Sequence, residues 1–435
     1  METTEHLFRR ESGRMVSVLT RIFGVHNLAL AEDVVQDAFC RALEVWSFRG
    51  MPENPSAWLM ATAKNRALDV LRRGRTARTF APELGRLLES EWTLVPIVEE
   101  LFAPHEIKDD QLRMMFSCCD PRLSEEARVG LVLHILCGFS VGEIASAYVS
   151  GHAAVEKRIT RSKKVLAKSK KLFDIASSAE FLARLPDVHR SLYLLFNEGY
   201  HGASAEMTIR VELCREAMRL TAQLLEHPLG ATTATYALAA LMSLHAARLP
   251  ARVDASGDLR SLFDQDRSQW DQQLLGEGLK LLGLSASGSE ITEYHVEAVI
   301  ASIHGSAPST EGTDWSAIVS LYDTLMAMRP SPIVALNRAI AIAQSEGPER
   351  GLDEIEKIAD RDRLATYPFH FAALGELEFR RGRYEIAREH FRAAFAQARN
   401  PMERRLFEKR MNACDPGDTS GAVRLDKARK RKPLP

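Results

Sequence analysis

The sequence predicts an all-α protein, and three features of its pattern lead to that prediction. Apolar residues recur at spacings of three and four along most of the chain, which is the period of a helix with one buried face. Alternating apolar and polar runs rich in β-branched residues, which would indicate strands, do not occur. Pro and Gly residues divide the second half into segments of helical length. We therefore expect small helical domains followed by a long series of helices.

The length of 435 residues exceeds what one ordinary core covers, so two or three domains are expected. Shifts in composition, and three prolines between residues 79 and 110, set the predicted boundaries. We predict a first domain over 1–78, a linker over 79–110, a second domain over 111–173, a helical extension over 174–414 and a disordered basic tail over 415–435.

Composition narrows the class of protein. No stretch approaches the roughly 18 to 20 apolar residues that span a bilayer, and the charged N-terminus lacks the apolar core of a signal peptide. We therefore expect a cytoplasmic protein with no membrane contact. The six cysteines lack the spacing of a zinc site and are interpreted as small core residues. No metal and no cofactor are predicted.

The formal net charge of −1 hides two basic segments. Residues 64–78 carry six basic residues against one acid, and residues 156–171 carry eight against one. Two such segments, about 90 residues apart, indicate two separate contacts with a polyanion such as DNA. Two solvated helix faces are the alternative interpretation of the same pattern.

The first domain contains a predicted helix pair. Its first helix has an apolar stripe formed by Val35, Phe39, Ala42 and Trp46. The outward face of that helix carries Asp33, Gln36 and Asp37. A loop from Ser47 to Pro55 leads to a second helix whose buried side carries Leu59, Ala63, Ala67 and Leu71.

The opposite face of this second helix suits unstacked bases. It presents an amide beside several cations, Asn65, Arg66, Asp69, Arg72 and Arg73, with Lys64 adjoining and Trp58 near the helix start. Asn reads base edges, an aromatic ring stacks on bases and Arg holds phosphates. A charged surface helix with one core aromatic explains these residues equally well.

The second domain contains a predicted helix-turn-helix. Ser140 and Glu143 have the spacing of a capping box, so a helix should begin there. A turn near Ser150 and Gly151 leads to a second helix with Val155 and Ile159 inward. In such motifs the start of the second helix enters the major groove. We expect base contacts from His152, Glu156 and Lys157, and phosphate or guanine contacts from Arg158 and Arg161.

These two domains together resemble the extracytoplasmic-function group of sigma factors in the sigma-70 family. Residues 31–39, 58–66 and 69–73 are similar to sigma region 2, and residues 139–145 and 155–159 to the region 4 helix-turn-helix. Ser150 and Gly151 depart from the apolar and capping residues usual there. The resemblance covers about 170 residues.

The resemblance implies a function for each surface. Asp33, Gln36 and Asp37 would bind the clamp helices of the β′ subunit of core RNA polymerase, which also engages sigma factors through its β subunit. Asn65 and its neighbours, with the loop, would capture the melted −10 element and hold a flipped base. The helix from His152 would read the −35 element as duplex. The expected function is promoter-specific transcription initiation, without enzymatic activity.

The extension carries a repeat pattern near residues 331–400. Small and large residues fit a tetratricopeptide helix pair: Phe371, Leu374, Gly375, Gly382, Tyr384, Ala387, Phe391 and Ala394. A degenerate unit precedes it, from Asn337 to Ile358. A groove for a protein or ligand and a stabilising cap are both compatible with such stacked pairs.

Polar clusters earlier in the extension resemble those of sigma factors with a tetratricopeptide-like C-terminal region. They are residues 196–200, residues 264–267 followed by Trp270, and residues 313–315. Glu198, Asp264, Asp266 and Arg267 are interpreted as a buried salt-bridged network, with a ligand pocket as the alternative.

Two other classes of function were weighed. An enzyme or ligand sensor fused to a DNA-binding module would need a catalytic constellation, and carboxylates near His189 and His201 are the only candidates. An ordinary repressor or activator would use the helix-turn-helix alone and leave the first domain unexplained. The sequence specifies neither the promoter, the inducing signal nor the oligomeric state.

Overall fold

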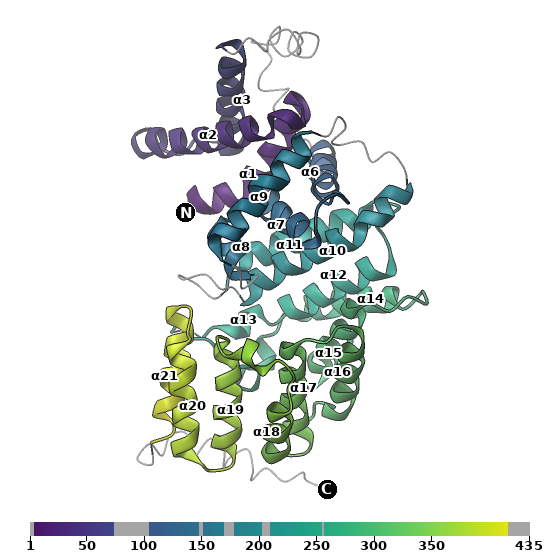
Figure 1. The fold of residues 1–435 in the computed structure, drawn as a ribbon, viewed down its shortest axis with the longest axis vertical. Coiled ribbons are helices and arrows are strands. Elements are labelled where there is room, and N and C mark those ends of the chain that lie inside the picture. The colour runs from purple at the N-terminus through teal and green to yellow at the C-terminus, as the bar shows by residue number, and fades with distance from the viewer. Residues whose placement is uncertain are drawn as a thin grey trace. The chain divides into compact units, whose positions relative to one another are not determined.

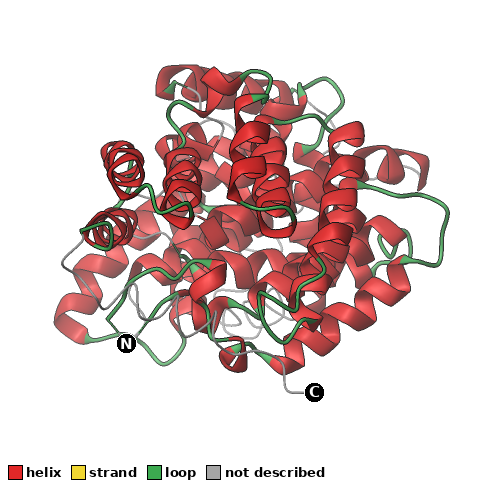
Figure 2. Ribbon diagram, turned by 90° about the horizontal axis from the view of Figure 1, so that it is seen from below, coloured by secondary structure: helices red, strands yellow, loops and turns green. Residues whose placement is uncertain are grey.

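A computed structural model describes residues 4–73, 104–147, 151–168, 178–201, 209–254 and 256–415. Helices joined by loops make up this part of the chain, and its only extended pairing is an isolated bridge between Val253 and Leu259 (Figure 2). The all-α prediction is confirmed. No helix in the described ranges is long and apolar enough to cross a membrane.

The chain forms two compact units. Unit 1 contains residues 1–199 and 211–232, and unit 2 contains residues 200–210 and 233–435. The helices that the sequence assigned to the start of the extension, between residues 174 and 232, therefore pack largely with the N-terminal unit. The predicted tail after residue 415 and most of the predicted linker lie outside the described residues.

Unit 1 begins with α1 (Thr4–Phe23), α2 (Leu28–Arg49) and α3 (Pro55–Arg73), which Figure 1 labels. Gly24 ends α1 with a φ of 82°, a conformation that only glycine adopts without strain, and the short 3-10 turn Val25–Asn27 leads into α2. The predicted stripe Val35, Phe39 and Ala42 is buried, and Trp46 is half-buried. Phe8 of α1 meets Phe39 edge-on, with ring centroids 4.8 Å apart.

The next four helices of unit 1 are α6 (Pro104–Cys118), α7 (Glu125–Cys137), α8 (Val141–Ala147) and α9 (His152–Ala167). The helical part begins earlier than the boundary predicted at residue 111, because Pro104 is a favourable first residue of a helix rather than a linker signal. Helix α1 packs against both α6 and α7. At Gly13 the approach is so close that a Cβ atom would lie 2.1 Å from the carbonyl oxygen of Leu136.

Helices α10 (Ser178–His201) and α11 (Val211–Glu226) complete unit 1. Arg184 of α10 donates to the backbone oxygen of Phe116 at 2.7 Å, and Arg219 of α11 donates to Gln111 at 2.8 Å. Asp187 pairs with Arg128 of α7. These contacts attach the beginning of the predicted extension to the second domain.

Unit 2 follows with a layer of helices that pack on one another. They are α12 (Thr233–Ala246), α13 (Leu249–Arg252), α14 (Gln272–Ser285), α15 (Glu293–Ser306) and α16 (Trp315–Met328), with 3-10 turns at Leu262–Asp264 and Arg267–Gln269. Helix α12 is buried almost all round, because both α14 and α15 pack against it. Leu244 of α12 closes on Gly278 of α14, where a Cβ atom would lie 2.7 Å from its side chain.

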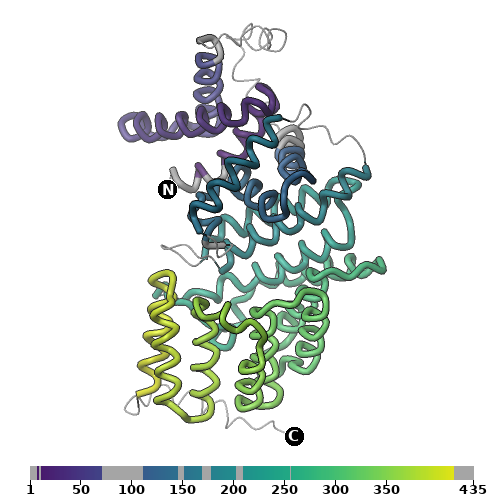
Figure 3. The backbone as a smooth tube through the Cα atoms, in the orientation of Figure 1, coloured from purple at the N-terminus to yellow at the C-terminus, as the bar shows by residue number. Residues whose placement is uncertain are grey.

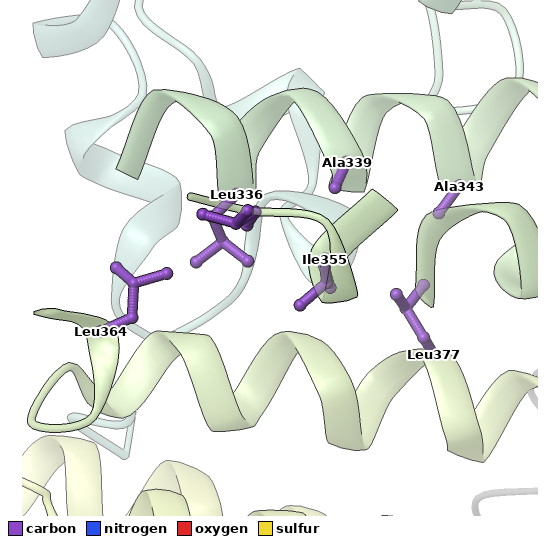
Figure 4. Packing of buried hydrophobic residues seen from close by; sticks show 7 residues of the cluster. Leu336, Ala339, Ala343, Ile355, Leu364 and Leu377 are labelled. Atoms are coloured by element: carbon purple, nitrogen blue, oxygen red, sulfur yellow. The ribbon is translucent and has the colours of Figure 1, made fainter. Parts of the chain in front are cut away.

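Helical hairpins end unit 2 and can be followed as a green-to-yellow tube in Figure 3. They comprise α17 (Pro332–Ser345), α18 (Pro348–Glu356), α19 (Pro368–Arg380), α20 (Tyr384–Ala396) and α21 (Pro401–Asn412), with a 3-10 turn at Arg361–Leu364. Leu336, Ala339, Ile355 and Leu377 form one apolar core across α17, α18 and α19 (Figure 4). Assignment of these pairs as tetratricopeptide repeats stays a prediction.

The predicted buried network of Glu198, Asp264, Asp266 and Arg267 is not formed as a unit. Asp264 is exposed and pairs with Arg410 at 2.9 Å, while Asp266 is exposed and caps the turn that begins at Arg267. Arg267 donates instead to the backbone oxygens of residues 304 and 307. Backbone carbonyls and local caps satisfy these charges, so no shared network is required.

Candidate nucleic-acid interface

The outward face of α2 is solvent-exposed as predicted. Asp33, Gln36 and Asp37 lie on it, between the buried positions of the same helix. Asp37 accepts a hydrogen bond from Nε of Arg66 on α3 at 3.0 Å, with both side chains about half-exposed. This ion pair joins the face predicted to bind polymerase to the face predicted to bind bases.

Helix α3 begins where Asn54 accepts a hydrogen bond from the backbone N–H of Ala57 at 3.0 Å. Trp58 lies in its first turn, half-buried, with its ring 5.3 Å from that of Trp46. Asn65, Arg66 and Asp69 are exposed about two to three turns further along. An amide, a guanidinium and a carboxylate therefore share the accessible surface of α3.

Lys64 does not belong to that surface. Its side chain is only 2% exposed, and its ammonium has no hydrogen-bond partner among the described residues. Burial lowers the pKa of Lys64 below its usual value. In this structure the predicted DNA contact of Lys64 is wrong, because Lys64 lies four residues from the buried Met60 and Leu68 and shares their face of α3. Arg72 and Arg73 lie in the last turn of α3, and their side chains are outside the described part.

The end of α2 and the loop that follows it carry exposed apolar residues that the sequence did not single out. Phe48 is 91% exposed and Met51 is 45% exposed, on either side of Gly50, whose φ is 76°. Phe48 is two residues after Trp46, so it does not continue the apolar stripe of Val35, Phe39, Ala42 and Trp46. That departure from the helical spacing is the sequence signal for an exposed aromatic side chain. Exposed large apolar side chains beside a basic helix suit stacking or wedging against bases.

The helix-turn-helix begins as the sequence predicts. Gly138 ends α7 in the left-handed conformation, and Phe139 donates its N–H back to Leu133. Ser140 and Glu143 then form the reciprocal capping box, with Glu143 accepting from the Ser140 N–H at 2.8 Å and donating its own N–H to the Ser140 hydroxyl at 3.2 Å. The predicted turn residue Ser150 lies outside the described residues.

Helix α9 buries Val155 and Ile159 as predicted and leaves its polar side open. His152, Glu156, Lys157 and Arg161 are exposed. Arg158 is half-buried and lies 3.9 Å from Glu126 of α7. Arg158 therefore differs from the other four predicted DNA contacts of α9: it lies near Glu126, whereas their side chains are exposed.

Further along α9, Lys163 contacts the first domain directly. Its ammonium lies 2.7 Å from Glu32 of α2, and His134 of α7 lies 3.8 Å from the same carboxylate. Burial first, and then the charge of Lys163, lower the pKa of His134, whose Nδ1 meets the backbone oxygen of Phe139 at 2.9 Å. The two predicted recognition helices α3 and α9 therefore belong to one packed unit, linked through α2.

Comparison with known proteins gives a match for the first domain. The family model described as sigma-70 region 2 matches residues 7–77, which contain α2, α3 and most of α1. A model described as a family of unknown function, DUF6596, matches residues 184–286. No solved structure matches the chain.

The chain also has a relative over most of its length. It is 36% identical over 390 residues to the uncharacterized protein R00370 of Rhizobium meliloti, and the match covers 89% of this chain and 90% of that protein. The two proteins belong to one family. The sigma-70 region 2 match supports a role of residues 7–77 in RNA polymerase binding and promoter recognition.

Proposed function

We propose that this chain is an extracytoplasmic-function sigma factor, which directs core RNA polymerase to promoters by reading a −10 element with α3 and a −35 element with α9. The observation that supports the proposal most is the sigma-70 region 2 match over α1, α2 and α3, together with the open polar faces of α2 and α3. A regulator that uses only a helix-turn-helix would leave that domain without a role.

In the proposed −10 contact, Asn65 reads a base edge and Arg66 holds a phosphate. Both are exposed on the same stretch of α3, and Asp37 orients the Arg66 guanidinium from α2. Phe48 in the last turn of α2 and Trp58 in the first turn of α3 supply aromatic surface for unstacked bases. Arg72 and Arg73 remain part of this proposal from the sequence.

The proposed polymerase contact uses Asp33, Gln36 and Asp37, which the polar face of α2 presents to solvent. Acidic and amide groups on a rigid helix suit the clamp helices of the β′ subunit, because complementary charge fixes the docking register. Asp37, proposed to bind polymerase, pairs with Arg66, proposed to bind DNA. The two proposed contacts are therefore adjacent on one surface.

In the proposed −35 contact, the first two turns of α9 enter the major groove. His152, Glu156 and Lys157 face outward there, and Arg161 lies one turn further toward the phosphates. Arg158, held near Glu126, contributes to register rather than to the first base contact. The exposed cations of this helix supply the salt-dependent part of binding.

We further propose that the extension regulates the sigma domains in cis. Arg184, Asp187 and Arg219, on α10 and α11, contact α6 and α7 of the helix-turn-helix domain. A change in the extension can therefore act on that domain through direct packing. Because these helices belong to the compact N-terminal unit, a truncation after Thr232 tests regulation without exposing the core that they cover.

Run-off transcription with purified core polymerase, this protein and fragments of its own genome tests the main proposal. Discrete transcripts that depend on the protein, and that are lost with Asn65→Ala, are the expected result. Specific duplex binding without polymerase and without transcripts would instead identify an ordinary regulator. For the extension, unchanged protein abundance and unchanged transcription after truncation at Thr232 would contradict regulation in cis.

A further inference from the structure

Unit 2 contains a group of basic side chains beside α13 that neither the promoter nor the polymerase contacts use. Arg248 stands at the N-cap position of α13 and Arg252 is its last residue, so the two arginines are four residues apart in the chain. His201 at the end of α10 and His245 near the end of α12 are close enough to both arginines for their charges to act on the two imidazoles. We call these four residues the α13 basic cluster.

Aromatic rings and polar neutral groups surround the cluster. The guanidinium of Arg252 lies 3.9 Å from the centre of the Tyr200 ring, and that ring lies 5.2 Å from His245. Arg248 lies 5.5 Å from the centre of the Trp270 ring and donates to the side-chain oxygen of Gln265 at 3.4 Å. Ring faces accept cations, but they do not neutralise them.

No carboxylate among the described residues pairs with either arginine of the cluster. Two other arginines of unit 2 have polar partners: Arg399 binds Glu403 at 2.8 Å, and Arg267 donates to two backbone oxygens and to Thr313. Arg252 is only 9% exposed, and its Nε has no hydrogen-bond partner in the described structure. A guanidinium that is nine-tenths buried without an anion is costly to maintain.

The two arginines and the burial of the cluster lower the pKa values of the neighbouring histidines. Burial lowers the pKa of His245 to about 3, and the charges of Arg248 and Arg252 add to the effect. Burial of the imidazole also lowers the pKa of His201, and the charges of Arg252, His245 and Arg248 add to this effect. Both imidazoles are therefore neutral near pH 7 and available as hydrogen-bond donors. His201 keeps exposed surface, which gives the cluster a route to solvent.

We propose that the α13 basic cluster is a binding site for a phosphate group, carried either by inorganic phosphate or by a small phosphorylated metabolite. Arg248 and Arg252 supply two positive charges with their donors, and His201 and His245 supply neutral donors. The cluster lies within residues 184–286, the part of the chain that matches a family of unknown function.

A phosphate group fits this cluster better than a singly charged anion. Two guanidiniums four residues apart carry a charge of +2, which one phosphate near pH 7 nearly balances. Arginine forks match the tetrahedral oxygens of phosphate through paired donors. A monocarboxylate or chloride would leave about one positive charge uncompensated in buried surroundings.

The binding test uses the full-length protein, isothermal titration and thermal unfolding. Inorganic phosphate and glycerol 3-phosphate are the probes, with potassium chloride at matched ionic strength and malonate as comparisons. The proposal expects saturable binding of at least one phosphate probe and a rise in Tm that chloride does not reproduce. Preference for the monoester would identify a metabolite as the source, and preference for inorganic phosphate would identify the free ion.

Two variants localise the effect. Arg252→Met should weaken phosphate binding by about tenfold or more, since it removes one charged donor group. The same variant should raise the Tm measured without phosphate, because it removes an uncompensated buried charge. Arg329→Met is the matched control, since Arg329 is 45% exposed and pairs with Glu293 at 3.0 Å. It removes the same charge from unit 2 and should leave phosphate binding unchanged.

Two results would overturn the proposal. One is a wild-type protein that responds equally to phosphate and chloride, or more strongly to malonate than to either phosphate probe. The other is equal weakening by Arg252→Met and Arg329→Met, which would indicate a general charge effect.

Discussion

The surface shared by α2 and α3 and the α13 basic cluster hold their positive charges in opposite ways. On the first, Arg66 is exposed and pairs with an exposed acid, Asp37. In the second, Arg248 and Arg252 have no carboxylate partner among the described residues, and Arg252 is nearly inaccessible to solvent. An exposed pair contributes little to stability, so nucleic acid or polymerase can break it at small cost. A buried unpaired charge is stabilised mainly by a ligand that brings the missing anion.

Charge reversal at Asp37 is expected to have the largest effect on the exposed surface. Asp37→Arg should weaken binding of core polymerase by about 2–3 kcal/mol, since it places a cation on an acidic docking face. Holoenzyme assembly followed by fluorescence anisotropy measures this. In the double variant Asp37→Arg with Arg66→Asp the ion pair is restored with reversed polarity. Recovery of polymerase binding in that variant would show that the pair, and not the docking charge, is what matters.

Neighbouring positions on α3 should differ sharply in their effect on promoter opening. Asn65→Ala should reduce open-complex formation by about tenfold, or about 1–2 kcal/mol, because an exposed amide that reads a base is lost. Lys64→Met should leave opening unchanged and increase the free energy of unfolding, since the Lys64 ammonium is buried without a partner in the described structure. Permanganate footprinting and urea unfolding measure the two quantities. Loss of opening with Lys64→Met would place its side chain on the DNA.

Lowering the pH should reduce the free energy of unfolding through buried histidines of unit 2, and not through the exposed surface of α2 and α3. The pKa of His245 and of His304 is lowered to about 3, mainly by burial, and in the unfolded chain both titrate near 6.5. The unfolded state therefore binds more protons between these values. The stability from these neutral imidazoles is present in full above about pH 6.5 and is lost as pH falls toward 3.

The expected slope is at most about 1.4 kcal/mol per pH unit for each histidine. Urea unfolding of the wild type and of His245→Gln at pH 7, 6 and 5 measures it. The variant should lose less stability between pH 7 and 5 than the wild type. Identical losses in the two proteins would show that His245 is not held neutral by the fold.

The smallest effect is expected on α9. Arg161→Ala should weaken duplex binding by holoenzyme about equally on all sequences and lower the slope of log affinity against log salt by about 1, because one phosphate contact is lost. Binding titrations from about 50 to about 300 mM salt measure the slope. A loss confined to one promoter sequence would assign Arg161 to base recognition instead.

Local signals predicted local structure well in this chain. The Ser140–Glu143 capping box, the start of α9 at His152 and the burial of Val155 and Ile159 all follow from short-range spacing, and the structure confirms them. The exposed positions of Asp33, Asp37 and Asn65 follow from the same helical period. Lys64 is the exception, because its assignment as a DNA contact follows from its charge and not from its position on the helix.

The amino-acid pattern was thus sufficient for the helical class, for the sigma-70 region 2 surface and for the cap of the helix-turn-helix, since each depends on residues within a turn or two of one another. Tertiary packing brought His201 to His245, Arg248 and Arg252, which are neighbours in the chain, and it attached α10 and α11 to the N-terminal unit. These groupings join segments far apart in the chain, and only the burial of side chains against other helices fixes which charges lose access to water.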